Sequence, residues 1–134
     1  MPSLRIKDAA GLLGVSDDTV RRWIDSGALP AEKDAAGRKV VDGKVLAEFA
    51  VEHATPPPNP LGSGTSARNR FVGLVTKVTT DTVMAEVQMQ CGPFTVVSLM
   101  SSESVRELGL EPGSVAVAMV KATTVIVETP EGTS

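Results

Sequence analysis

Residues 6–30 read IKDAAGLLGVSDDTVRRWIDSGALP, and this stretch predicts two short helices joined by a tight turn. The first helix is indicated by apolar residues at helical spacing, namely Ala9, Leu12 and Leu13. The pattern then breaks at Gly14. Ser16 is a good N-cap for a second helix, because the two acids that follow it lie in the first turn, where the helix dipole favours them. The buried face of this helix is marked by Val20, Trp23 and Ile24. Gly27 and Pro30 end it.

The residues that follow predict a small hairpin and a third helix. Residues 31–41 contain an Ala36-Gly37 pair flanked by Lys33, Arg38 and Lys39, which is typical of a hairpin or wing. The third helix is indicated by an Asp42 cap and by apolar residues at Val45, Leu46 and Phe49. The first half of the chain is therefore predicted to be a small helical unit with one hairpin.

A linker is predicted at residues 54–65, which read ATPPPNPLGSGT, carry no charge and hold four of the nine prolines. Such a composition is stiff and extended where it is rich in proline, and flexible where it is rich in glycine and serine. It separates residues 1–53, with a net charge of −1, from residues 66–134, with a net charge of −2. We therefore expect one domain at 1–53 and a second at 66–130.

The second half of the chain changes to an alternation of period two. In this part Val83, Ala85, Val87 and Met89 alternate with Met84, Glu86, Gln88 and Gln90. Similar strands are predicted at 71–78, 94–100, 114–121 and 124–128. One helix, Glu103–Leu108, interrupts them, with Ser102 as its cap and Gly109 at its end. Five short strands with one helix predict a partly closed barrel of the OB type, so that the whole chain is an α+β protein of two domains.

The composition argues against several classes of function. The chain has a single cysteine, Cys91, and a single histidine, His53, whereas a disulfide, a zinc site or a His- or Cys-based catalytic device needs more such groups. No paired carboxylates, nucleophile-base set or phosphate loop is visible, so we expect no enzyme, no metal site and no covalent cofactor. No stretch approaches the roughly 20 apolar residues that cross a bilayer, and no signal-peptide pattern is present. The expectation is a cytoplasmic protein without membrane contact.

The stretch Ile6–Pro30 resembles the helix-turn-helix of the MerR and excisionase-like families, and the resemblance covers residues 3–52. It rests on the Ala-Ala pair, the Gly-Val turn, the Ser cap, and the patterns Val-x-x-Trp-Ile and Gly-x-Leu-Pro. In those families the helix that corresponds to Asp17–Ser26 enters the major groove of double-stranded DNA, and the following wing touches the DNA backbone. The resemblance implies a DNA-binding surface of Ser16, Thr19, Arg21, Arg22, Arg38 and Lys39.

The chemistry of these residues fits that role, although ordinary solvated charges are the alternative for Arg21 and Arg22. Arginine is the natural bidentate partner of guanine, and cations on a wing can reach phosphates. The net charge of −1 over residues 1–53, with the acids Asp17 and Asp18 at the tip, opposes the approach of phosphate. We therefore expect a lone copy to bind DNA weakly, and several tethered copies to bind it well.

Three segments of the second half together resemble a molbindin, the Mop or TOBE domain that binds molybdate and tungstate. They are SARNRFVGLV at 66–75, SSESVRELGL at 101–110 and KATTVIVE at 121–128. In that family the groups equivalent to Ser66–Arg68, Ser101, Ser104 and Lys121 line an anion site between subunits. The oxyanion-binding residues implied here are Ser66, Ala67, Arg68, Ser101, Ser104, Lys121, Ala122 and Thr123.

A tetrahedral dianion needs a ring of donors, and these residues supply one. Arg68 offers a fixed fork of N–H groups, Lys121 a point charge, and the serines hydroxyl and backbone donors. Each residue also has a plainer interpretation. Arg68 could pair with an acid such as Glu103, Lys121 could be a solvated strand end, and the serines could be helix caps.

A DNA-reading head joined to a molbindin is similar to the organisation of ModE-type molybdate-responsive regulators, although their head is a different winged-helix arrangement. The hypothesis is that molybdate or tungstate, bound between C-terminal domains, stabilises one oligomeric arrangement and so sets the spacing of the heads on DNA. The alternative is a molybdate or tungstate storage protein whose head is an anchor or an accessory DNA-binding module. A homo-oligomer is expected in both cases, either a dimer or a hexamer built as a trimer of dimers.

Overall fold

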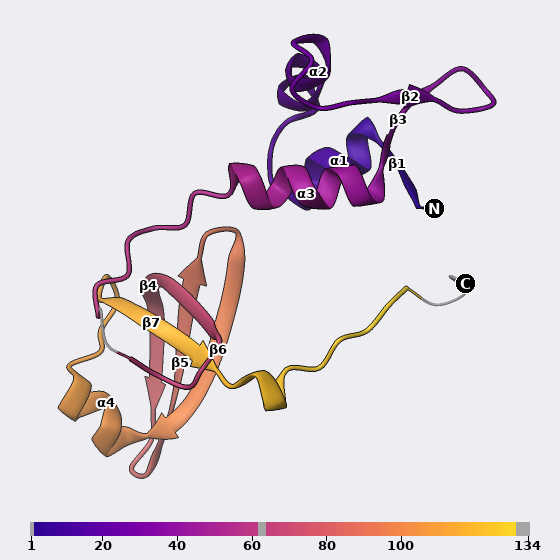
Figure 1. Cartoon of the computed structure of the whole chain (residues 1–134). Helices are drawn as coiled ribbons and strands as arrows, with labels where there is room; N and C mark the ends of the chain where they lie inside the picture. The colour runs from indigo at the N-terminus through magenta and orange to yellow at the C-terminus, as the bar shows by residue number, and fades with distance from the viewer. Residues whose placement is uncertain (1, 62–63, 131–134) are drawn as a thin grey trace. The chain divides into compact units, whose positions relative to one another are not determined.

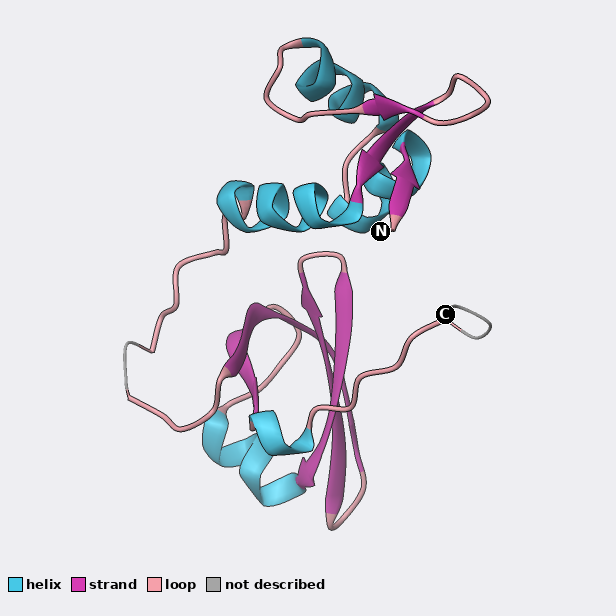
Figure 2. Ribbon diagram, turned by 45° about the vertical axis from the view of Figure 1, so that its right-hand side comes forward, coloured by secondary structure: helices cyan, strands magenta, loops and turns pink. Residues whose placement is uncertain are grey.

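The computed structural model describes residues 2–61 and 64–130, and the chain divides into two compact units, Met1–Pro56 and Pro57–Ser134. The first unit consists of helices with a small sheet, and the second is a curled antiparallel sheet with one helix (Figures 1 and 2). The α+β class predicted from the sequence is confirmed. Residues 62 and 63 of the expected linker lie outside the described residues.

The described residues of the first unit form three helices and a three-stranded antiparallel sheet. The elements are β1 (Ser3–Arg5), α1 (Ile6–Leu13), α2 (Asp17–Asp25), β2 (Glu32–Lys33), β3 (Lys39–Asp42) and α3 (Gly43–His53). The sheet has the order β1-β3-β2, with Leu4 opposite Val41 and Lys33 opposite Lys39. The sequence predicts the three helices and the β2–β3 hairpin. It does not predict β1, because three residues are too few for an alternation to be visible.

The turn between α1 and α2 follows from two local signals. Gly14 adopts a φ of 70°, a left-handed conformation that glycine takes at little steric cost, and it closes α1. Ser16 is the N-cap of α2, and its Oγ accepts a hydrogen bond from the backbone N–H of Thr19 at 3.2 Å. These two residues therefore set where one helix ends and the next begins.

The core of the first unit connects the three helices to β3. Its buried residues are Ala9, Ala10, Val20, Leu29, Val41, Leu46 and Phe49. Trp23 packs against this cluster, with its ring centroid 4.8 Å from that of Phe49. Leu12 shares the helical spacing of Ala9 but is 68% exposed, because α1 faces the core through its two alanines. Apolar contacts thus hold α2 from behind and leave its outer face open.

The described residues of the second unit form four strands, one helix and one short 3-10 helix. The elements are β4 (Asn69–Thr80), β5 (Met84–Cys91), β6 (Phe94–Ser101), α4 (Ser102–Leu108), β7 (Val115–Val120) and η1 (Ala122–Thr124). The strands form one sheet of order β6-β5-β4-β7, antiparallel throughout. The alternation predicted for β5 is confirmed at Ala85, Val87 and Met89, which lie in the core. It is wrong at Val83, which precedes β5 and is 67% exposed.

The sheet curls because β4 changes partner along its length. Residues 69–74 pair with β7 and residues 74–80 pair with β5, with a register shift between Val75 and Lys77. At the crossing, β5 lies so close to Gly73 that an added Cβ would stand 2.7 Å from Cys91 Sγ and would also meet the Gln90 carbonyl oxygen. Glycine is therefore required at this position.

The structure differs from the expected five-stranded barrel at residues 124–128, where it has no strand. Ala122–Thr124 form η1 instead, in which the Thr124 N–H donates to the Lys121 carbonyl oxygen at 3.0 Å. Residues 125–130 follow without regular structure. A strand forms only where a neighbouring edge receives its hydrogen bonds, and within one chain this segment lies on no edge. A second correction concerns α4, whose N-cap is Ser101, with Ser102 as its first residue.

Candidate functional site

The outer face of α2 carries three of the predicted DNA-contact residues, joined by hydrogen bonds. The Thr19 hydroxyl lies 3.0 Å from Ser16 Oγ and accepts a hydrogen bond from Arg22 Nη2 at 3.1 Å. A guanidinium has five N–H donors in a planar fork, so this contact orients Arg22 and leaves donors for an outside acceptor. All three residues are partly or fully exposed.

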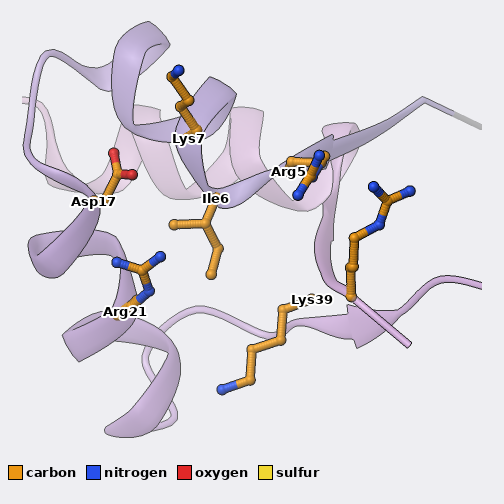
Figure 3. Close-up of a pocket in the computed structure, with 7 residues that line it drawn as sticks. Arg5, Ile6, Lys7, Asp17, Arg21 and Lys39 are labelled. Carbon is orange, nitrogen blue, oxygen red and sulfur yellow. The ribbon is translucent and has the colours of Figure 1, made fainter. Parts of the chain in front are cut away.

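The other three predicted residues line a pocket of about 300 Å³ in the first unit. Its lining consists of Arg5, Ile6, Lys7, Asp17, Arg21, Arg38 and Lys39. Figure 3 shows Ile6 in the middle, with Arg21 on the α2 side and Arg5 and Lys39 on the sheet side. Five cations surround one acid, so the pocket has the charge that attracts a phosphate group.

Three of these five cations also pair with acids that lie outside the pocket lining. The ion pairs are Arg21–Asp18 at 3.5 Å, Arg38–Asp34 at 3.3 Å and Lys39–Asp25 at 3.7 Å. Five of these six side chains are about half exposed or more, Asp34 being the exception at 28%, and exposed pairs of this kind contribute only about 0–1 kcal/mol. They can therefore give way to a phosphate at small cost.

Asp34 has a structural role in addition to its ion pair. Its Oδ1 accepts hydrogen bonds from the backbone N–H groups of Ala36 and Arg38, both at 2.9 Å. These bonds, first among them the one from the Arg38 N–H, hold the pKa of the Asp34 carboxyl below its usual value despite an opposing effect of desolvation. The carboxylate thus shapes the hairpin turn and fixes the direction of Arg38.

Arg5 and Lys7 belong to this pocket although the sequence does not single them out. None of the ion pairs found among residues 2–61 and 64–130 involves either of them. Arg5 reaches the pocket because β1 pairs with β3, which sets Arg5 opposite Val40, next to Lys39. The sequence could indicate that Arg5 lies near Lys39 only if residues 3–5 were known to form a strand, because helical periodicity carries no information about these residues.

Two residues of the predicted oxyanion site, Ser101 and Ser104, meet at the end of β6. Ser101 Oγ accepts a hydrogen bond from the Ser104 N–H at 3.0 Å, and the two hydroxyl oxygens are 2.8 Å apart. Both side chains are partly buried, and the exposed Glu103 lies between them in the sequence. Ser101 therefore caps a helix, which is the alternative role that the sequence analysis gave to the serines. The hydroxyl groups of Ser101 and Ser104 can still donate or accept a further hydrogen bond.

The other six predicted residues gather where β4 begins and β7 ends. Asn69 pairs with Val120, and its side-chain amide donates to the Val120 carbonyl oxygen at 3.1 Å. The chain segments on either side of this pair, Ser66–Arg68 and Lys121–Thr123, therefore emerge next to each other. In this group Ala67 is partly buried and the others are exposed.

Within one chain these two groups lie at opposite ends of the sheet. Thr80 at the far end of β4 faces Ala85, and Met84 faces Ser101, so the serines lie at the end of β4 that is remote from Asn69. The same separation puts Glu103 far from Arg68 along the sheet. No ion pair of the described residues includes Arg68 or Lys121. A single chain thus presents two partial sets of donors.

No cluster of three or more His, Cys, Asp or Glu side chains that could hold a metal ion occurs in the described part of the chain. Over the same residues, every helix is too short or too polar to cross a bilayer.

Two protein families match the chain, one in each unit. Residues 3–52 match a helix-turn-helix domain family, and residues 65–127 match the TOBE domain family. Both are families of binding domains and not of enzymes. The comparison with curated proteins finds no match.

Solved structures that match the chain include two molybdate-binding proteins and the protein MopII. One from Sporomusa ovata is 33% identical, and the match covers 50% of this chain and 100% of that chain at a TM-score of 0.49. MopII from Clostridium pasteurianum is 36% identical, with 49% and 100% covered and a TM-score of 0.46. The cytoplasmic protein ModG, in a form with molybdate bound, is 38% identical, with 54% and 52% covered and a TM-score of 0.50. The chain therefore spans about half the length of ModG.

Proposed function

Because the chain belongs to the TOBE domain family and carries a helix-turn-helix domain ahead of it, we propose that it is a molybdate-responsive DNA-binding regulator. One observation carries the proposal: a DNA-binding family and a domain 38% identical to molybdate-bound ModG occur in the same chain. Tungstate has the same charge and shape and is a second expected ligand. A regulator of this kind works in the cytoplasm, where it meets both the anion and the DNA.

The oxyanion site of this proposal is shared between copies of the chain. One copy contributes Ser101 and Ser104, and a neighbour contributes Ser66–Arg68 with Lys121–Thr123. The proposal is supported by the strand register, which puts these two groups at opposite ends of one sheet. A dianion that bridges two copies loses its hydration shell, and charge-assisted hydrogen bonds from both copies would offset that cost. Each such bond contributes about 1.5–3 kcal/mol.

The DNA contacts of this proposal divide into base readers and phosphate contacts. Thr19, Arg21 and Arg22 on α2 enter the major groove with Ser16 at the helix start. The pocket cations Arg38 and Lys39, joined by Arg5 and Lys7, hold the phosphate backbone. The converging cations around Ile6 support the second part of this assignment.

Oligomer formation is the proposed link between anion and DNA. A shared anion site favours the assembled dimer, or a hexamer built as a trimer of dimers, over the single chain, because the anion binds only where two copies meet. Assembly multiplies the DNA-binding heads, and tethered heads bind DNA far more tightly than one head. The Pro-rich segment between the units transmits geometry loosely, so coupling through the number of heads is favoured over a rigid rotation.

Calorimetric titration with molybdate tests the shared anion site. We expect Arg68→Ala or Lys121→Ala to weaken binding by about 10- to 150-fold, the loss of one charge-assisted bond, and Lys77→Ala on the same sheet to leave it unchanged. An equal mixture of an Arg68→Ala chain and a Ser101→Ala chain should recover full affinity in about a quarter of its sites, because about half of the dimers are mixed and one of the two sites in each mixed dimer unites two intact halves. Wild-type affinity in both cationic variants would refute the site, and no recovery on mixing would refute its sharing.

Selection of duplexes from a random-sequence DNA pool, with and without molybdate, tests the regulator. For a selected duplex, Arg22→Ala should cost about 1–3 kcal/mol and relax the preference at one base pair. Arg5→Ala should instead weaken binding to every sequence and reduce the salt dependence by about one phosphate contact. Arg106→Ala on α4 is the matched control. Failure to enrich any duplex in either anion state would remove the regulatory function.

The second candidate is a molybdate storage protein, and one observation favours it. The first unit has a net charge of −1, and three of its pocket cations already have acidic partners, so its attraction for DNA is weak. Full molybdate affinity without any DNA binding would favour storage over regulation.

A further inference from the structure

The outer face of α2 carries a continuous run of hydrogen bonds that joins Arg22, Thr19 and Ser16. Arg22 Nη2 donates to the Thr19 hydroxyl at 3.1 Å, and the Thr19 and Ser16 hydroxyl oxygens lie 3.0 Å apart. Residues three apart share one face of a helix, so the three side chains line up along α2. The opposite face packs into the core through the buried Val20. The run therefore lies on a helix whose position is fixed by packing.

The direction of the hydrogen bonds in this run follows from the chemistry of its ends. A guanidinium only donates, so the Thr19 hydroxyl oxygen accepts from Arg22. At the other end, Ser16 Oγ accepts the backbone N–H of Thr19 at 3.2 Å as the helix cap. Hydrogen bonds polarise one another when they run head to tail, which favours donation from the Thr19 hydroxyl to Ser16 Oγ. The run then passes from Arg22 through Thr19 to Ser16.

This run restrains the Arg22 side chain before any DNA is bound. An arginine loses much rotamer freedom when it binds a base, and a hydrogen bond that already holds the side chain reduces that loss. Thr19 uses one of the five N–H groups of the guanidinium, and the other four remain in its planar fork. Guanine presents two acceptors, N7 and O6, in the major groove, and such a fork matches them. Arg22 is therefore oriented to bind a guanine.

Arg21, the neighbouring arginine, is held in a different way. Its partner is Asp18 at 3.5 Å, and the two side chains are 54% and 90% exposed. An ion pair this open to water restrains a side chain only weakly. Arg21 also lines the cation pocket, where Figure 3 shows it on the α2 side. Among the described residues, Arg22 is thus the one arginine of α2 whose guanidinium is held by a side-chain hydroxyl.

We propose that Thr19 is a positioning residue through which Arg22 selects a guanine in the DNA site. The proposal rests on the proposed function, because it assigns a role within the contact between α2 and the major groove. Thr19 acts on the base pair only through Arg22, whose guanidinium it holds. The preference for guanine at one position of the site is therefore set by the Thr19 hydroxyl as well as by the arginine that makes the contact.

Nuclear magnetic resonance of the full chain without DNA tests the restraint. Thr19→Val keeps the branched shape, the helix propensity and the backbone N–H that bonds Ser16 Oγ, but it removes the hydroxyl. We expect the order parameter of the Arg22 Nε–H group to fall in Thr19→Val and to return in Thr19→Ser. Thr79→Val, at an exposed threonine of β4, is the matched control and should leave it unchanged. Equal order parameters in the wild type and Thr19→Val would overturn the inference.

A double-mutant cycle on a duplex selected from the random-sequence pool tests the selection of guanine. The affinity for this duplex is divided by that for the same duplex with adenine in place of the guanine whose preference depends on Arg22. This ratio should be about 5- to 150-fold in the wild type. Thr19→Val should lower it by about 2- to 12-fold, with an unchanged salt dependence because no charge is altered. Arg22→Ala should abolish the preference, and Thr19→Val added to Arg22→Ala should change nothing further.

Three results of the binding measurements would contradict the inference. A further loss when Thr19→Val is added to Arg22→Ala would mean that Thr19 contacts DNA itself. An unchanged ratio in Thr19→Val alone would mean that Arg22 needs no support, and a preferred base other than guanine would remove the assigned contact. Failure to select any duplex would overturn the proposed function and the reading of guanine with it. The order parameters of the protein without DNA would still decide whether Thr19 restrains Arg22.

Discussion

Replacing Gly73 with alanine should destabilise the second unit because of one close crossing in the sheet. An ideal Cβ at this position would lie 2.7 Å from Cys91 Sγ and would also meet the Gln90 carbonyl oxygen. Ordinary contacts between such atoms are about 3.5–4 Å, so β4 and β5 would have to separate by nearly 1 Å. They cannot separate freely, because Leu74 pairs with Gln90 at the next position.

The size of the effect follows from this geometry. Overpacking of a well-packed interior costs about 1–3 kcal/mol, and we expect the upper end because one obstructing atom belongs to the backbone and the other to a buried side chain. In a domain of 60–100 residues, each kcal/mol lowers Tm by about 4–8 °C, so a loss of about 10–20 °C is expected. Adding Cys91→Ala should restore only part of it, because the Gln90 carbonyl remains.

Calorimetric melting of the full chain measures this loss. Trp23 is the only tryptophan and belongs to the first unit, so its fluorescence identifies the transition that should not move. Gly11→Ala in α1 is the matched control, because nothing lies within 4 Å of an added Cβ there, and it should be neutral or stabilising by up to about 1 kcal/mol. A Gly73→Ala protein that melts like the wild type would show that β4 and β5 cross less closely than described.

Three further predictions concern local hydrogen bonds. Asp81 Oδ1 accepts hydrogen bonds from the N–H groups of Met84 and Val83, and these bonds lower the pKa of the Asp81 carboxyl. The stability that the ionised carboxyl contributes is present above the unfolded-state pKa and is lost as pH falls through the folded-state pKa. The Tm advantage of the wild type over Asp81→Asn should therefore shrink below pH ~4, and a difference that stays constant with pH would contradict this prediction. Ser102, 2% exposed, donates its hydroxyl toward the Asp81 and Met84 carbonyls at 2.8 and 3.0 Å, so Ser102→Ala should cost about 1–3 kcal/mol in urea unfolding, and an unchanged midpoint would count against that bond. Asp34→Ala should weaken DNA binding although it removes a negative charge, because the hairpin turn loses the hydrogen bonds that Asp34 accepts. Asp34→Asn keeps an acceptor oxygen, so in a fluorescence polarisation assay it should bind DNA at least as well as the wild type.

Sequence reasoning succeeds for elements whose cause is local. The α2 helix begins after Ser16 as predicted, because the cap bond joins residues three apart. The β5 strand is recognisable because its alternation needs only its own residues. The reasoning fails for β1, which exists only through pairing with β3 some 40 residues later. It also fails for Leu12, whose exposure depends on which face of α1 the other elements cover.

The candidate sites divide in the same way. Residue types indicate an anion-binding half and a DNA-binding half, because hydroxyls, guanidinium groups and ammonium groups carry their chemistry wherever they lie. That Arg5 stands beside Lys39 depends on a strand register, which no local pattern contains.

The sequence by itself determined the helix ends, the strand alternation, the two-part organisation and the kinds of ligand each half suits, because caps, periodicity and charge act over a few residues. Only the tertiary structure decided that Ser66–Arg68 and Lys121–Thr123 flank the same strand pair, that Ser101 lies at the other end of the sheet, and that residues 125–127 form no strand. These facts depend on the change of partner along β4 and on strand pairing between segments far apart in the chain, which no local pattern of residues contains.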